Sequence, residues 1–152
     1  MALDYHTSAQ VKVRLQATKW GNDSNSIPTN AEAEAIMESV ENEVDSALED
    51  LYTVPISGTL SLSVVKEMCI LKTSGKIAQI QGAQGSDAYL ALAREWIREA
   101  DQMLKDIVSG VKDLSDATVG KTAELDTQVK GSFTTTNTTE DSNPVFTVTE
   151  VV

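Results

Sequence analysis

The segment "TNAEAEAIMESVENEVDSALEDLY" (Thr29–Tyr52) constrains the fold most strongly, because its pattern is that of an amphipathic helix. Thr29 and Glu32 have the spacing of a capping box directly after Pro28, which predicts where the helix begins. Apolar side chains then recur at steps of three and four and form one stripe, Ala33, Ile36, Val40, Val44, Ala47, Leu48 and Leu51. A helix with one apolar stripe packs that stripe against other elements, so we expect a helical bundle.

The other faces of this segment are acidic. Between Thr29 and Tyr52 the chain carries eight carboxylates and neither Lys nor Arg. Four of them are helical neighbours, Glu34, Glu38, Glu41 and Asp45. Such a row could in principle hold a cation, but the Glu-x-x-His pairs of di-iron bundles are absent from the sequence. We therefore interpret the row as an acidic surface and expect neither a metal nor another cofactor.

Three further segments have helical periodicity. They run from Thr7 to about Thr18, from about Ser61 to Gln81, and from a cap at Ser86 to a stop at Gly110. In the middle one, Gly75 predicts a kink or the close approach of a neighbouring backbone, and three lysines are expected to point outward, Lys66, Lys72 and Lys76. The predicted core of the bundle is Ile36, Val40, Val44, Val64, Met68, Leu71, Leu90, Trp96, Ile97 and Leu104.

The C-terminal segment Gly131–Val152 differs from everything before it. It is rich in Thr and Val, has strand propensity and lacks a helical period, and its apolar residues are Phe133, Val145, Phe146, Val148 and Val151. Such a segment is too short to form a sheet of its own. We expect it to be mobile in the free subunit and to order by adding a strand to a neighbouring molecule.

These observations predict a mainly α protein, with a small bundle of three to four helices and an extended, strand-like C-terminal arm. The helical domain is expected to cover residues 1–112, and the linker and arm residues 113–152.

Composition and single residues narrow the function classes. The formal net charge of −11 argues against a protein that grips nucleic acid, which requires clustered Lys and Arg. The single cysteine, Cys69, excludes an intramolecular disulfide and is expected in the core. The single histidine, His6, is expected to be a surface residue of a mobile N-terminus. The glycines form no phosphate-binding motif, so the sequence favours a protein that is not an enzyme.

The N-terminus has neither the apolar run nor the cleavage site of a secretory signal, and no apolar stretch approaches the roughly 20 residues of a membrane span. The expectation is a soluble protein made in the cytoplasm, without a membrane partner.

Three features of residues 5–112 resemble the head-tail connector (adaptor) proteins of long-tailed bacteriophages. They are the opening helix "SAQVKVRL", the pattern that ends in "EVDSALEDLYTVP" at Pro55, and a last helix that starts "YLALAREWI" at Tyr89. The ending "NPVFTVTEVV" is similar to that of one branch of these proteins, with Thr147 and Val148 where that branch carries a basic residue.

The resemblance implies a structural virion protein, assembled in the host cytoplasm, that forms a twelve-fold ring in the phage neck. Such a ring joins the portal of the DNA-filled head to the next neck or tail ring and lets the genome pass without binding it specifically. The acidic helix would then face the channel, a neighbouring copy or solvent.

Charge asymmetry is compatible with a ring of identical copies. The acidic helix has net charge −8, whereas Met1–Trp20 and the Lys-containing helix each have net charge +2. Acidic and basic faces on one chain favour head-to-tail contacts, which close into a ring if the rotation allows. Two alternatives stay open: a six-fold tail-completion or other neck or tail ring component, and a non-viral helical module that binds a basic partner through Thr29–Tyr52.

Overall fold

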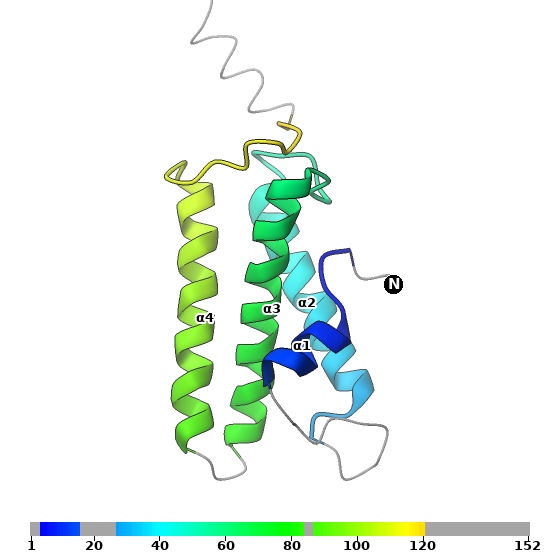
Figure 1. Cartoon of the computed structure of the whole chain (residues 1–152), viewed down its shortest axis with the longest axis vertical. Coiled ribbons are helices and arrows are strands. Elements are labelled where there is room, and N and C mark those ends of the chain that lie inside the picture. The colour runs from blue at the N-terminus through cyan, green and yellow to red at the C-terminus, as the bar shows by residue number, and fades with distance from the viewer. Residues whose placement is uncertain (1–3, 16–26, 84–86, 121–152) are drawn as a thin grey trace, which may run out of the picture.

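The computed structural model describes residues 4–15, 27–83 and 87–120, which form four helices (Figure 1). These are α1 (Ser8–Leu15), α2 (Asn30–Leu48), α3 (Thr59–Gly82) and α4 (Asp87–Val108). The described part contains no strand; Tyr52 and Val119 form an isolated antiparallel bridge. The predicted mainly helical fold is confirmed, whereas the predicted arm, Gly131–Val152, lies outside the described residues.

Helix α2 begins at the predicted capping box. The Thr29 hydroxyl accepts a hydrogen bond from the Glu32 amide at 3.3 Å, and the Thr29 amide donates to the Glu32 carboxylate at 2.9 Å. The helix ends at Leu48, earlier than expected. Its buried side is Ala33, Met37, Val40, Glu41, Val44 and Leu48. The predicted stripe was therefore largely right, but Met37 is more deeply buried than the predicted Ile36, which is half-buried.

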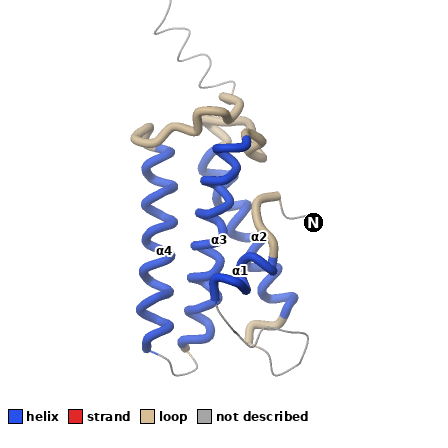
Figure 2. The backbone as a smooth tube through the Cα atoms, in the orientation of Figure 1, coloured by secondary structure: helices blue, strands red, loops and turns tan. Residues whose placement is uncertain are grey.

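Helix α3 is the central element. It lies between α4 on one side and α1 and α2 on the other, and it contacts all three (Figures 1 and 2). Because neighbours cover it on several sides, even its polar residues Thr73 and Ser74 are buried. The core has two clusters, one around Val44, Met68 and Leu71 and the other joining α1 to Met37 and Ile77; Trp96 of α4 packs against both.

Close contact between α3 and α4 depends on Gly75. A Cβ atom at this position would lie 2.6 Å from Cγ1 of Ile97 and 3.0 Å from the carbonyl oxygen of Ala93. Contacts this short do not occur with a real side chain, so the glycine lets the two helices approach. Of the two consequences predicted for Gly75, the close approach is confirmed.

Helix α4 covers only one side of α3, so its apolar face is incompletely buried. Ala93, Ala100 and Ile107 are its buried residues. Its larger apolar side chains are half-buried in the single subunit, Tyr89, Leu90, Trp96, Ile97, Met103 and Leu104. The predicted stop at Gly110 fits a backbone φ of 73° there, and the predicted cap at Ser86 lies outside the described residues.

The chain after α4 returns across the end of the bundle to the start of α3 (Figure 1). The Asp116 carboxylate accepts hydrogen bonds from the amides of Leu60 (2.7 Å) and Ser61 (2.8 Å), which are free donors in the first turn of α3. Gly58 accommodates this contact, because a Cβ there would lie 2.3 Å from the Asp116 carbonyl oxygen. Residues 113–120 thus pack on the helical body, beyond the domain boundary predicted at 112.

Candidate functional site

The predicted acidic row on α2 divides into two parts with different environments. Glu41 is buried and Asp45 is half-buried, and both bind the N-terminal segment. Glu34 is exposed and Glu38 is half-buried, and both line an open cleft. The structure therefore does not bring the four carboxylates together as one surface, and the prediction was wrong for Glu41.

Glu41 anchors the residues that precede α1. Its Oε1 atom accepts hydrogen bonds from the amides of Tyr5 (2.9 Å) and His6 (3.1 Å), and its Oε2 atom accepts one from the amide of Asp4 (2.9 Å). The imidazole Nδ1 of His6 lies 2.8 Å from the same Oε1. A buried carboxylate is tolerated only when donors surround it, and the N-terminal segment supplies those donors.

His6 is buried, with 2% of its surface exposed, so the predicted surface histidine was wrong. Its Nε2 lies 2.9 Å from the Thr73 hydroxyl of α3, opposite the contact with Glu41. In the neutral ring, Nδ1–H donates to the carboxylate and Nε2 accepts from Thr73, which satisfies both nitrogens. Burial lowers the pKa of His6 below its ordinary value, although the Glu41 carboxylate opposes this shift.

The order hydroxyl, imidazole and carboxylate in Thr73, His6 and Glu41 is that of a catalytic triad. The Thr73 side chain, however, has no exposed surface, so a substrate cannot reach its oxygen in this conformation. We therefore assign the three residues a structural role: they join the N-terminal segment to α2 and α3.

Tyr5 makes a second connection from the N-terminal segment. Its hydroxyl donates to the Asp45 carboxylate and accepts a hydrogen bond from the Ile56 amide at 2.9 Å. Burial and the neighbouring carboxylate raise the pKa of Tyr5. Burial also raises the pKa of Asp45, against the effect of the hydrogen bond from Tyr5. Asp45 is thus committed to a contact within the subunit.

The open part of the acidic row lines a cleft of about 610 Å³ between α2 and the N-terminal segment. Glu34 and Glu38 supply its carboxylates, and Ala31 and Ala35 supply small apolar side chains. The rest of its lining comes from His6, Thr7 and Ser8. This is the part of the predicted acidic surface that remains accessible to a partner.

Lys72 of α3, predicted to point outward, is only 5% exposed. Its Nζ lies 2.7 Å from Glu43 of α2 and 2.6 Å from Asp101 of α4, and Lys76 reaches the same Glu43 at 3.2 Å. Burial opposes the charge of Lys72, but the two carboxylates prevail and raise its pKa. Two of the three lysines expected to give α3 a basic surface, Lys72 and Lys76, therefore bind within the subunit.

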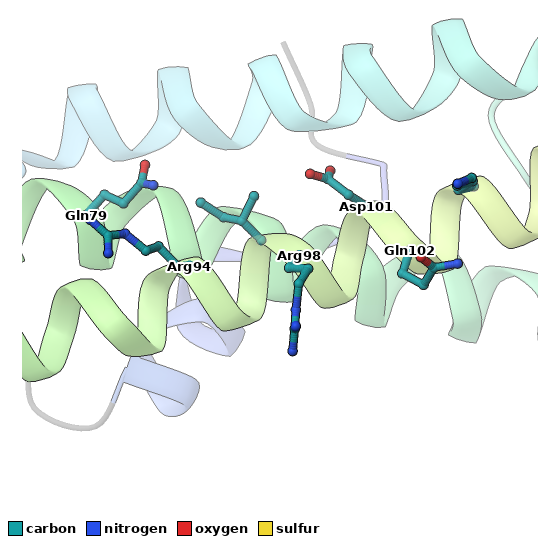
Figure 3. A pocket seen from close by; sticks show the side chains of 7 residues that line it. Gln79, Arg94, Arg98, Asp101 and Gln102 are labelled. Atoms are coloured by element: carbon teal, nitrogen blue, oxygen red, sulfur yellow. The ribbon is translucent and has the colours of Figure 1, made fainter.

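Basic side chains instead gather on α4. A groove of about 350 Å³ runs along this helix and is lined by Arg94, Ile97, Arg98, Asp101, Gln102, Lys105 and Gln79 of α3 (Figure 3). In this view Arg94 lies beside Gln79, and Arg98 extends away from the bundle. Because Asp101 is paired with Lys72, the groove is basic overall.

The sequence analysis misplaced Glu41 and His6, and the burial of Glu41 could have been predicted from the sequence. Glu41 lies at helical steps from Met37, Val44 and Leu48, so it belongs to the buried stripe rather than to the acidic face. No local pattern revealed that His6 would fill the space beside it, because that contact joins residues 35 positions apart. Cys69 is buried as predicted, and burial raises the pKa of its thiol.

The predicted interface residues Phe133, Val145, Phe146, Val148 and Val151 all lie outside the described residues. Among the residues that are described, no group of three or more His, Cys, Asp or Glu side chains could hold a metal ion. Within the same part of the chain, no helix combines the length and apolar character needed to cross a membrane.

Comparison of the chain with protein-family models, with curated proteins and with solved structures gives no match.

Proposed function

We propose that this protein is a ring-forming structural component of a bacteriophage neck. In this role, copies of the chain join the portal of the filled head to the next neck or tail ring and leave a passage for the genome. The starting point is the resemblance to head-tail connector proteins. The fold is compatible with it, because its three motifs fall in α1, in α2 with the turn that follows it, and in α4.

The observation that carries this proposal is the incomplete burial of α4. Trp96, Ile97, Met103 and Leu104 belong to its apolar face, yet each is only half-buried in the single subunit. Apolar side chains grouped along a helix are more stable when a second surface covers them. A subunit whose helix keeps this surface available is suited to an assembly.

The charge of the protein fits a passage for DNA. Each copy has a formal net charge of −11, so a ring of copies would be strongly negative. A negative wall repels the phosphate backbone and does not hold DNA as Lys- or Arg-rich surfaces do. With this charge, the genome would slide through the ring without specific contacts.

Joining of heads to tails tests the proposal. We expect a phage that lacks this gene to accumulate DNA-filled heads and free tails, and the full-length chain supplied separately to restore joining. A chain truncated after Lys130 should fail to restore it, because the arm is proposed to bind the neighbouring ring. Normal joining without the gene would contradict the function, whereas joining by the truncated chain would contradict only the role of the arm.

The second candidate, a module that binds a basic partner, is favoured by the cleft with Glu34 and Glu38. It predicts a monomer or dimer in solution that binds a soluble basic ligand. Sedimentation velocity separates the candidates, because a connector forms large closed rings of uniform mass. Six copies per ring would favour the tail-completion alternative over a twelve-fold connector.

A further inference from the structure

The basic groove on α4 contains two guanidinium groups, those of Arg94 and Arg98. Arg94 and Arg98 are both exposed and lie one helical turn apart. No ion pair among the described residues uses either of them. Ile97 lines the same groove as a half-buried apolar side chain that packs against Gly75 of α3. The groove therefore offers two positive charges to a partner.

The cleft on α2 has the complementary arrangement. Glu34 and Glu38 are also one helical turn apart, and neither takes part in an ion pair among the described residues. Ala31 and Ala35 are the small side chains that line the cleft beside them. On both helices a step of four residues places the two charges about 6 Å apart along the axis. Two carboxylates can thus face two guanidinium groups in register.

The two surfaces face different sides of the molecule. Where α4 comes near α2, Lys72 joins Asp101 of α4 to Glu43 of α2, whereas Glu34 and Glu38 line the cleft beside the N-terminal segment, which lies across α3 from α4 (Figure 1). Arg94 and Arg98 therefore cannot reach Glu34 and Glu38 of the same copy without unfolding the bundle. They can meet those of a second copy, and such a contact leaves one acidic and one basic surface free for the next.

We propose that α4 of one copy docks on α2 of the next, with Arg94 and Arg98 facing Glu34 and Glu38. The choice of a second copy as the partner rests on the proposed ring. The contact is heterologous, since each copy uses two different surfaces, and it forms a closed ring when the rotation between copies closes. It also covers part of the apolar face of α4.

Charge reversal in the full-length chain tests this contact. Arg94→Glu/Arg98→Glu and Glu34→Lys/Glu38→Lys should each weaken self-association at least about tenfold, because like charges then face each other. Combining all four substitutions in one chain should restore association, since the signs are exchanged on both surfaces. Mixing the two double variants should also restore it. Sedimentation velocity measures the association, and circular dichroism checks that each variant is folded.

Two matched variants serve as controls, because each makes the same change of charge as the α2 reversal. Glu49→Lys/Asp50→Lys alters exposed residues beyond the end of α2, and Glu140→Lys/Asp141→Lys alters the C-terminal segment. Neither control variant should change association by more than about twofold. In the wild-type chain, association through this contact should weaken as NaCl rises from about 50 to about 500 mM. If Glu140→Lys/Asp141→Lys weakens association while Glu34→Lys/Glu38→Lys does not, the groove holds the C-terminal segment and the proposed contact is wrong.

The inference and the proposed function can fail separately. Wild-type chains that associate without any effect of the charge reversals would overturn the contact and leave the ring standing. If the charge reversals change association as expected but the protein plays no part in joining heads to tails, the contact is supported and the neck function is overturned. A wild-type chain that stays monomeric throughout would overturn both.

Discussion

Helix α3 is held to α4 and to the elements on its other side by different physical means. On the side of α2 and the N-terminal segment, buried polar groups meet, with Glu41 and His6 at the centre. On the side of α4, small residues allow close contact, with Gly75 against Ala93 and Ile97. The first junction depends on charge and protonation, whereas the second depends on shape at Gly75 and has the ion pair between Lys72 and Asp101 beside it. The two should therefore respond to different perturbations.

The polar junction is stable only while its buried polar groups keep their hydrogen-bond partners. Glu41 is tolerated because three amides and one imidazole surround it, and loss of any partner leaves a buried group unsatisfied. The close contact at Gly75 involves no such donors, and there the junction cannot accept extra volume.

The largest loss of stability is expected when a carboxylate is placed in the core without hydrogen-bond donors around it. Val44→Asp places one on the buried stripe of α2 one turn after Glu41, at a side chain with no exposed surface. We expect a loss of more than about 4 kcal/mol in the free energy of unfolding, enough to prevent folding. Thermal melting followed by circular dichroism measures it, with Ser46→Asp on the exposed surface as the control. An unchanged melt of the Val44→Asp variant would show that the assigned burial is wrong.

Removal of Glu41 breaks the polar junction alone. Glu41→Ala leaves the amides of Asp4, Tyr5 and His6 without their acceptor and should cost about 3 kcal/mol. Glu38→Ala removes a carboxylate from the same helix and should change stability by less than about 0.5 kcal/mol. Urea unfolding compares the two variants, and equal losses would contradict the division of the acidic row.

The close-packed junction is tested by one methyl group. Gly75→Ala should improve helix propensity by about 1 kcal/mol but introduce a clash that costs more, for a net loss of about 1 kcal/mol. Ile97→Ala in the same chain removes the nearest side-chain atom, so the two changes together should cost less than the sum of each alone. Strict additivity in urea unfolding would show that Ile97 does not limit the space.

The smallest effect is a dependence on pH that only the polar junction should show. Burial lowers the pKa of His6 in the folded chain, so between that pKa and about 6.5 the unfolded chain binds the proton more readily. Stability from neutral His6 is therefore present above pH 6.5 and is lost as the pH falls through the folded pKa. Glu41 and Lys66 are the charged groups that act on this ring.

His6→Gln removes this titration and serves as the comparison for the pH dependence. Between pH 7.5 and about 5.5, urea unfolding should show a smaller loss of stability in the variant than in the wild type. Parallel pH curves for the two proteins would show that His6 does not contribute.

Local patterns were sufficient to predict the helices. The capping box at Thr29 was confirmed, and so was the close approach at Gly75, because both depend on neighbouring residues or on the absence of a side chain. Partners remote in sequence were not predictable in the same way. His6 and Lys72 were expected at the surface, yet each is buried because carboxylates on other elements of the fold bind it.

The surfaces differ from the predicted ones for the same reason. Charge counts by segment predicted a basic surface on α3. Lys72, however, forms ion pairs with Glu43 and Asp101, and Lys76 forms one with Glu43. The exposed arginines Arg94 and Arg98 lie on α4, whose total composition is not basic. Net charge per helix does not reveal which charges remain available, because that depends on which helices are neighbours.

The return of residues 113–120 to the start of α3 has a mechanical consequence. The Thr53 amide donates to the Thr118 carbonyl oxygen at 2.8 Å, and the Gly120 amide donates to the Leu51 carbonyl oxygen at 2.9 Å. A force applied to the chain beyond Gly120 would load these two bonds and the Asp116 cap before it reached α4. The tension would enter the bundle beside the central helix, and α4 would be spared until this attachment gave way.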